Sequence, residues 1–339
     1  MSSPIYKHAI VGFGIAGQLL ALEMLKSVSP KDILILDKNF LGGALATDYA
    51  TVISNTPWKK TKTALQHYPD FSAEAIQEGD SKYPETDCMP VGDIAKYCLS
   101  TSLKAAASCD KLTAEVQIVY IINDDLFELR HTFGKVPVRN VFVCTGAKEK
   151  TLDFELPQIP LSIALDKMRL ARFVDSKKDH VVVFGTAHSG TLVLANLNEL
   201  GVKTTAVYQG TQPFRYARDG AYDGIKEGSE KIADSIQLSG HPNLTLVSLS
   251  DISAVHKNLK KATKAIYCIG FDKTVPSHVD HSYDAQTAMV GTVPRIYGYG
   301  IAYPGKSTVD GKEYVDVSVL SFQEQIQRTL PAILEKSNP

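Results

Sequence analysis

Two stretches of the chain, roughly 170 residues apart, repeat one pattern of apolar and polar positions. In the first, an apolar run over 6–11 leads into a glycine-rich turn, a helix-like segment over 18–26 and an apolar run that ends at Asp37. In the second, an apolar run over 181–184 leads into small residues, a helix-like segment over 191–200 and another apolar run. Short apolar runs bounded by glycine are typical of buried strands. The pattern predicts an α/β protein with two similar strand–turn–helix–strand units.

The segments outside these units are interpreted in the same way. Strand-like runs that turn residues separate at 123–125 and 134–135 predict an antiparallel meander over 114–122, 126–132 and 138–144. Further strands are expected at 204–208, 244–248 and 265–268, and helices at about 90–107, 229–238 and 317–335. Residues 67–90 are polar and rich in Pro, Asp and Glu, which predicts a long loop.

The glycine turn of the first unit has the spacing Gly12-x-Gly14-x-x-Gly17. Gly12 permits a tight turn out of the strand, Gly14 lets the backbone approach a pyrophosphate, and Gly17 lets the helix lie close to the sheet. The helix N-terminus offers N–H groups and a positive dipole end to phosphates. Asp37 follows 20 residues after Gly17, where a carboxylate can bind ribose hydroxyls. We expect a dinucleotide here; the alternative is a glycine-rich turn that serves packing alone.

Two segments after Asp37 are further candidates for the first site. Gly43 belongs to a glycine pair that allows close backbone approach to a cofactor. The segment from Ser54 to Trp58 carries the only tryptophan and several polar side chains, so Asn55 is expected to hydrogen-bond near a ring system. The alternative for this segment is a turn, since Ser-Asn-Thr-Pro is common in turns.

The second unit departs from the first at two positions. Its turn runs from Gly185 to Gly190, with Ala187 at the second glycine position, and Tyr208 or Gln209 stands where an acid would bind ribose. Without that acid a 2′-phosphate is not repelled. This unit therefore has a weaker glycine pattern and no acid at the position that would bind ribose.

Three polar residues are candidates for contacts to a nucleotide in the second unit. Arg215 and Arg218 lie just downstream and could pair with a 2′-phosphate, although they could equally be solvated arginines. His188 lies inside the turn, where it is either a pyrophosphate contact or an exposed loop residue.

Composition limits the possible partners. The 339 residues are 44% hydrophobic with a formal net charge of −1, which gives no electrostatic reason to bind nucleic acid or a membrane. The five cysteines form no CxxC pair, and the histidines show no metal-ligand spacing, so we expect neither a disulfide framework nor a metal. The first strand begins about six residues from the start, so no signal peptide is expected and a cytoplasmic location is favoured.

The whole chain resembles the two-dinucleotide-binding-domain flavoproteins, which include flavin-containing monooxygenases and thioredoxin-reductase-like enzymes. The resemblance rests on Gly12/Gly14/Gly17 with Asp37, Cys144-Thr145-Gly146, Gly185 through Gly190, Ile269-Gly270 and the Val-Pro-Arg-Ile-Tyr-Gly-Tyr-Gly stretch. It implies two Rossmann-like three-layer domains, the second inserted into the first. The first, 1–152 with 275–339, would bind FAD, and the second, 153–274, would bind NADPH or NADH.

The resemblance also implies the residues of each site. The expected FAD contacts are Gly12, Gly14, Ile15, Ala16, Gly17, Asp37, Lys38, Gly43, Asn55, Thr56, Trp58, Val116, Thr145, Gly146, Gly300 and Ile301. The expected NAD(P)H contacts are Gly185, His188, Ser189, Gly190, Arg215, Arg218 and Gly270. Ile301 stands where many family members have an aspartate that contacts the flavin.

The activity implied is hydride transfer from NAD(P)H to FAD and then to oxygen, an organic substrate or a carrier protein. Because no CxxC pair exists, thiol–disulfide exchange is excluded. The Gly-x-x-x-Ser-Gly form of the second turn and the Asn55 segment are similar to flavin monooxygenases, which favours oxygenation of an N or S centre with Asn55 as the catalytic residue. The alternatives are a ferredoxin- or flavodoxin-type NADP reductase and a degenerate FAD-binding redox sensor. A homodimer is common among relatives.

Overall fold

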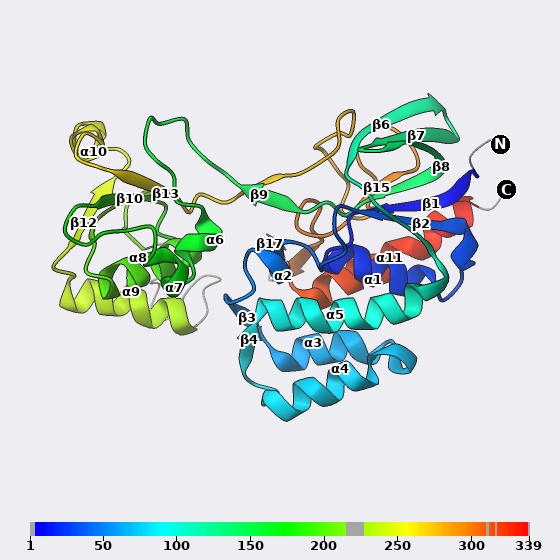
Figure 1. Cartoon of the computed structure of the whole chain (residues 1–339), viewed down its shortest axis with the longest axis horizontal. Coiled ribbons are helices and arrows are strands. Elements are labelled where there is room, and N and C mark those ends of the chain that lie inside the picture. The colour runs from blue at the N-terminus through cyan, green and yellow to red at the C-terminus, as the bar shows by residue number, and fades with distance from the viewer. Residues whose placement is uncertain (1–3, 215–226, 310–311, 316, 338–339) are drawn as a thin grey trace. The chain divides into compact units, whose positions relative to one another are not determined.

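The computed structural model describes residues 4–214, 227–309, 312–315 and 317–337 (Figure 1). The chain divides into two compact units, Met1–Ala147 with Lys273–Pro339 and Lys148–Asp272. Two short strands, β9 (Ala147–Glu149) and β14 (Phe271–Lys273), pair with each other where the chain passes between the units. The second unit is therefore an insertion in the first.

The first unit is built on a seven-stranded sheet with the order β5-β2-β1-β8-β7-β6, with β15 pairing with the end of β8. Its strands are β1 (Tyr6–Val11), β2 (Ile33–Asp37), β5 (Asp110–Thr113), β6 (Val116–Asn123), β7 (Leu126–His131), β8 (Gly134–Val143) and β15 (Ile296–Gly298). The strands β5, β2, β1, β8 and β15 are parallel, while β6 and β7 run antiparallel to their neighbours. The expected meander is confirmed. Its second turn, however, falls at 132–133, because Gly134 and Lys135 already pair with β7.

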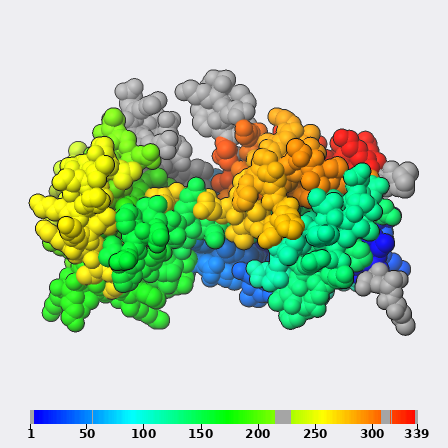
Figure 2. Space-filling view, turned by 90° about the horizontal axis from the view of Figure 1, so that it is seen from above, coloured from blue at the N-terminus to red at the C-terminus, as the bar shows by residue number. Residues whose placement is uncertain are grey.

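Both faces of this sheet are covered, which explains why its central strands are continuous apolar runs. Ile10 faces a cluster shared with the helices, whereas Ala9 and Val11 face a second cluster on the opposite side. Figure 1 shows α1 (Ile15–Met24), α5 (Val91–Ala105) and α11 (Val319–Ser337) below the sheet. On the other face, Figure 2 shows the 274–300 segment, in orange, against the meander, where Val119 N–H donates to the Ser277 carbonyl at 3.1 Å.

The predicted loop over 67–90 is wrong, because most of it is a helix. α4 (Pro69–Lys82) begins with Pro69 at its first turn and buries Ser72, Ala75 and Gly79. This spacing of i, i+3 and i+7 places three small residues on one helix face. A Cβ at Gly79 would lie 2.3 Å from the Trp58 ring, so α4 packs closely against α3 (Trp58–Gln66). The polar composition that suggested a loop belongs to the exposed face.

The second unit is a four-stranded parallel sheet with the order β12-β11-β10-β13. Its strands are β10 (His180–Phe184), β11 (Lys203–Tyr208), β12 (Leu244–Ser248) and β13 (Lys264–Tyr267). Its helices are α6 (Leu161–Ala164), α7 (Lys167–Leu170), α8 (His188–Glu199), α9 (Glu227–Ser239) and α10 (Ile252–Leu259). The strands and helices expected from the sequence here are confirmed.

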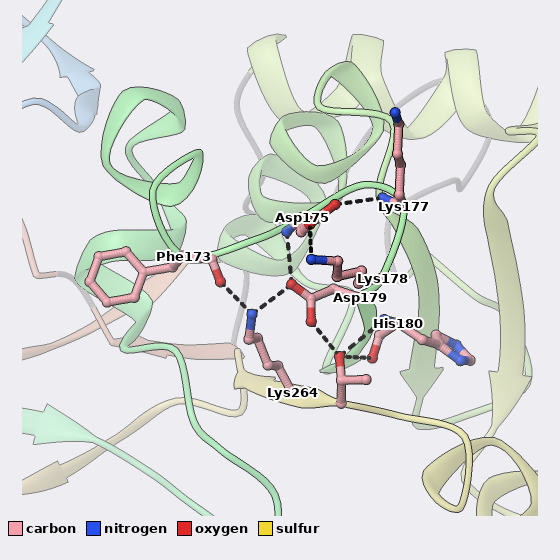
Figure 3. A network of polar contacts seen from close by, with 8 residues as sticks. Phe173, Asp175, Lys177, Lys178, Asp179, His180 and Lys264 are labelled. Atoms are coloured by element: carbon pink, nitrogen blue, oxygen red, sulfur yellow. Dashed lines mark hydrogen bonds and ion pairs between the residues drawn. The ribbon is translucent and has the colours of Figure 1, made fainter.

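A polar network fixes the amino-terminal edge of this second sheet (Figure 3). The Lys264 ammonium donates to the Phe173 carbonyl at 2.7 Å and pairs with Asp179 at 2.6 Å. Asp179 also accepts from the Thr263 hydroxyl at 2.8 Å and from the Asp175 N–H at 2.7 Å. Burial alone would raise the pKa of Asp179, but these donors hold it below its ordinary value. The network joins the 173–179 loop to β13.

The remaining elements are short. They are α2 (Ala44–Thr47), β3 (Ile53–Pro57), β4 (Cys88–Pro90), β16 (Lys306–Val309), β17 (Lys312–Val315) and the 3₁₀ turns Pro30–Asp32 and Ala106–Ser108. β3 pairs with β4 and β16 with β17, both antiparallel.

Candidate dinucleotide sites

The first glycine turn requires glycine at two positions for steric reasons. Gly12 has φ +96°, and a Cβ there would lie 2.5 Å from the Cys144 carbonyl oxygen. A Cβ at Gly17 would lie 2.0 Å from the Gly12 carbonyl oxygen. Both distances are far below van der Waals contact, so a side chain at either position would push α1 away from β1 and β8. We call this arrangement of Gly12, Gly14, Gly17 and the Cys144 carbonyl the first cradle.

The N-terminus of α1 is bordered by backbone rather than by side chains. Gly14 has the relaxed angles φ −71° and ψ −175°, and a Cβ at Gly43 would lie 2.9 Å from the Gly14 Cα. On another side, a Cβ at Gly300 would lie 2.7 Å from the Ala16 Cβ. The first N–H groups of a helix lack intrahelical acceptors, and the dipole there is positive. Three glycines therefore leave room for an anionic group at a helix end, which fits the pyrophosphate of a dinucleotide.

Asp37 holds two loops of this site together. One carboxylate oxygen accepts from the Phe13 N–H at 2.7 Å, and the other accepts from the N–H groups of Asn39 and Phe40 at 2.9 and 2.8 Å. A carboxylate has about four acceptor positions, so one is still available for a ribose hydroxyl. The sequence predicted the ribose contact. It did not predict that Asp37 bridges two loops, because the positive φ of Phe40, +52°, leaves no signal in the residue pattern.

Three other expected FAD contacts lie at the carboxyl ends of strands. Ile15 and Ala16 form the first turn of α1 after β1, and Lys38 is exposed after β2. Ligands in open α/β sheets bind at this end of the strands, so these three positions are consistent with one site. Val116 is at the amino end of β6, with 8% of its surface exposed.

The returning chain is anchored beside this site by Thr145 and Gly146. The Thr145 hydroxyl donates to the Thr274 carbonyl, and the Thr274 N–H donates to the Gly146 carbonyl at 3.0 Å. Thr145 therefore uses its side chain to hold the backbone in place. Sequence reasoning missed Thr274, which acts through its backbone alone.

Ile301 presents an apolar side chain at this end of the sheet. It follows Gly300, whose φ is +82°, and 43% of its surface is exposed. The turn is closed by the Tyr303 N–H, which donates to the Gly300 carbonyl at 2.9 Å. No carboxylate is available at this position, so any polar contact to a flavin here would come from the backbone.

The segment from Ser54 to Trp58 is neither a turn nor a uniform cofactor surface. It forms β3, in which the Ser54 hydroxyl accepts from the Thr56 N–H at 2.8 Å, and Thr56 is 8% exposed. The side chain of Asn55 lies outside the described part of the structure. Trp58 is fully buried, packs against Gly79 and Tyr97, and donates its indole N–H to Asp80 at 2.8 Å. The structure assigns Trp58 to packing, which corrects its expected contact with the cofactor.

The second glycine turn has the same geometry as the first. A Cβ at Gly185, which has φ +89°, would lie 2.4 Å from the Cys268 carbonyl oxygen. A Cβ at Gly190 would lie 2.1 Å from the Gly185 carbonyl oxygen. We call Gly185, Ala187, Gly190 and the Cys268 carbonyl the second cradle. The matching distances show that the turn between strand and helix is packed in the same way in both units.

Ala187 does not distort the second cradle. Its φ and ψ are −75° and −168°, close to the values of Gly14 in the first. The weaker glycine pattern of this unit is therefore compatible with the same loop conformation. The difference between the two cradles is the presence of a methyl group where a ligand would approach.

The structure describes some, but not all, of the other expected contacts of the second site. His188 and Ser189 begin α8, and the His188 Nδ1 lies 2.6 Å from the Ser229 hydroxyl of α9. Gly270 has φ +96° and follows β13. Tyr208 ends β11 in the position of the missing acid. Arg215 and Arg218 lie outside the described residues.

The cysteines are placed for packing rather than for redox exchange. Cys98, Cys109, Cys144 and Cys268 are buried, and only Cys88 is exposed. Burial raises the pKa of the Cys98 thiol to about 12 and also raises the pKa of Cys144 and Cys268. Such thiols are not thiolates near neutral pH. Within the described ranges, no group of His, Cys, Asp and Glu is arranged to hold a metal, and none of the described helices is long and apolar enough to cross a bilayer.

Comparison with known proteins supports this geometry. Residues 9–148 match a family model described as FAD-NAD(P)-binding. No curated protein matches the chain. The FAD-bound cadaverine monooxygenase of desferrioxamine biosynthesis from Erwinia amylovora is similar over 99% of this chain and 96% of its own, with 13% identity and a TM-score of 0.67.

Two further solved structures have the same architecture. A flavin-containing monooxygenase from Stenotrophomonas maltophilia is 13% identical, with a TM-score of 0.66 and coverage of 97% and 98%. The bacillithiol disulfide reductase from Staphylococcus aureus is 14% identical, with a TM-score of 0.63 and coverage of 98% of both chains.

The solved structures establish the fold of the chain. The chain has the fold of the two-dinucleotide-binding-domain flavoproteins, as the sequence resemblance predicted. Its segment 9–148 matches the family model described as FAD-NAD(P)-binding.

Proposed function

We propose that the protein is an FAD-dependent NAD(P)H oxidoreductase, in which the first unit binds FAD and the second binds NADPH or NADH. The observation that supports this most is the repetition of one cradle geometry, at Gly12 and Cys144 in the first unit and at Gly185 and Cys268 in the second. A protein with one dinucleotide ligand needs one such cradle. The presence of two cradles in one chain supports the binding of two dinucleotides that exchange electrons.

The residues of the first unit have separate roles in this proposal. The N–H groups at the start of α1 hold the pyrophosphate, and Gly14 and Gly43 keep side chains away from it. Asp37 holds the loops after β1 and β2 together and accepts a hydrogen bond from a ribose hydroxyl. When bound, FAD supplies the redox chemistry, and the protein orients the reacting groups and limits access of water.

We favour oxygenation of an amine nitrogen or a thioether sulfur as the oxidative reaction. The Gly-x-x-x-Ser-Gly turn and the Asn55 segment support this choice, and two of the similar structures are described as monooxygenases. Another similar structure is a disulfide reductase, which would favour disulfide reduction. This sequence, however, has no CxxC pair, and its buried thiols have raised pKa values. Asn55 is the proposed catalytic residue, and small molecules are the proposed substrates.

Two observations favour a second candidate, a flavin-binding redox sensor without turnover. Ile301 lacks the carboxylate expected beside the flavin, and Tyr208 lacks the acid expected beside the second ribose. An anaerobic titration with NADPH and NADH separates the two candidates. Bleaching of the flavin absorbance supports the oxidoreductase, whereas bound flavin that neither nucleotide reduces would support the sensor.

A further inference from the structure

A cavity of about 620 Å³ lies at the far end of α1 from the first cradle. It is lined by the start of β1, the last turn of α1 with the residues that follow it, and the last turns of α11. All of these elements belong to the first unit. The volume is within the range of small-molecule sites, and the position is distinct from the strand ends that form the dinucleotide site.

His8 presents a hydrogen-bond donor to this cavity. The residue is 4% exposed and lines the cavity, and its Nδ1 lies 3.4 Å from the Asn140 Nδ2. Because the same Nδ2 donates to the Lys7 carbonyl at 2.9 Å, the amide nitrogen faces the ring, so Nδ1 accepts and Nε2 carries the proton. No acceptor for Nε2 exists among the described residues. Burial lowers the pKa of His8 to about 4, so the ring is neutral near pH 7.

Carboxylate groups also line the cavity. Glu23 is 9% exposed, accepts from the Tyr68 hydroxyl and the Gln327 amide, both at 2.7 Å, and pairs with Lys26 at 2.9 Å. Burial alone would raise the pKa of Glu23, but these donors hold it below its ordinary value, so it is charged. Glu335, which also lines the cavity, is exposed and forms no ion pair within the described chain.

Backbone groups add to the negative potential. α1 and α11 both end at this cavity, and the C-terminus of a helix carries a partial negative charge. Pro331 lies inside α11 and has no N–H, so the carbonyl of Gln327 lacks its usual intrahelical donor. Lys7 and Lys26 pair at 2.9 Å with Asp32 and Glu23 and balance their charges, so Glu335 and the helix ends carry the remaining negative potential.

Apolar side chains also line the cavity. Leu330 is 4% exposed, and Leu334, Pro331 and Val28 line the cavity beside it. The cavity thus combines an N–H donor without a partner, acceptors that suit an ammonium group, and an aliphatic surface.

We propose that this cavity binds a zwitterion, an amino acid with an apolar side chain. The ligand's carboxylate accepts from His8 Nε2–H, its ammonium group lies towards Glu335 and the helix ends, and its side chain packs against Leu330 and Leu334. This site goes beyond the proposed redox function and does not depend on it, since none of its residues belongs to either cradle.

Isothermal titration calorimetry of the full-length protein with three matched probes tests the ligand chemistry. The probes are L-leucine, 3-methylbutylamine, which lacks the carboxylate, and 4-methylpentanoate, which lacks the ammonium group. We expect saturable binding of L-leucine and an affinity at least about tenfold lower for each of the others, the loss of one hydrogen bond to a charged group. No binding of L-leucine, or equal binding of all three, overturns the proposal.

Variants of the cavity test its position. His8→Phe and Glu335→Gln should each weaken L-leucine binding by about tenfold, since each removes one polar contact. Glu335 is exposed, so Glu335→Gln tests the site even if the His8 variant does not fold. Glu324→Gln, on an exposed position of α11 outside the cavity, is the matched control and should bind L-leucine like the wild type. Unchanged binding by Glu335→Gln contradicts the proposed placement of the ammonium group.

Discussion

Replacement of Gly14 by alanine separates the conformation of the first cradle from its contact with a cofactor. Gly14 has φ −71°, which any residue adopts, and a Cβ there would lie 3.8 Å from the Gly43 Cα, an ordinary contact. Ala187 already holds the same conformation in the second cradle. The flavin-free Gly14→Ala variant should therefore have a free energy of unfolding within about 1 kcal/mol of the wild type.

A pyrophosphate that lies on the backbone of Gly14 would meet the added methyl group. Overpacking of this kind costs about 1–3 kcal/mol, which corresponds to a loss of about 5- to 140-fold in FAD affinity. Titration of the flavin-free protein with FAD, followed by quenching of flavin fluorescence, measures the affinity, and urea unfolding measures the stability. Ala187→Gly is the matched control, with FAD affinity unchanged. Equal FAD affinity for Gly14→Ala and the wild type would refute the contact.

Three further predictions test other parts of the structure. Gly190→Ala places a Cβ 2.1 Å from the Gly185 carbonyl oxygen, so NADPH affinity should fall at least about tenfold while FAD remains bound; a parallel loss of FAD would contradict separate sites. His8 has a pKa of about 4 in the folded state and about 6.5 when unfolded, so it contributes about 3 kcal/mol of stability above pH 6.5 that is lost as pH falls towards 4. His8→Phe should flatten this part of the pH–stability curve, and an unchanged curve would show that other groups cause it. Gly79→Ala should lower stability by about 1–3 kcal/mol despite alanine's better helix propensity, because the methyl group meets the Trp58 ring, and calorimetric unfolding at a higher Tm would refute that packing.

The sequence predicted the parts of the fold that rest on local pattern. Continuous apolar runs became the parallel strands, which in the first unit have both faces of their sheet covered, and the glycine spacing located both strand–helix turns. The glycine requirement at Gly12 and Gly17 follows from contacts with carbonyl groups, one of which belongs to Cys144, distant in sequence. The sequence showed that glycine is needed at these positions, but it did not show that the Cys144 carbonyl is the group that excludes a side chain at Gly12.

Long-range packing explains what the sequence did not reveal. α4 looked like a loop because its segment is polar and rich in Pro, Asp and Glu, and only the position of the Trp58 ring shows why Gly79 is there. Trp58 itself looked like a cofactor contact because its neighbours are polar, yet its ring is fully buried among helices. Two of the three backbone donors on Asp37, the N–H groups of Asn39 and Phe40, depend on the path of the loop after β2, which no residue pattern specifies.

The cofactor content of the purified protein tests the central claim most directly. The measurement is the absorbance spectrum, followed by release and quantification of the bound nucleotide. We predict a flavin band near roughly 450 nm and one FAD per chain, lost in Gly17→Ala, in which a Cβ lies 2.0 Å from the Gly12 carbonyl oxygen. A well-folded wild-type protein that carries no flavin, and takes up none when FAD is added, would contradict the assignment of the first cradle as an FAD site.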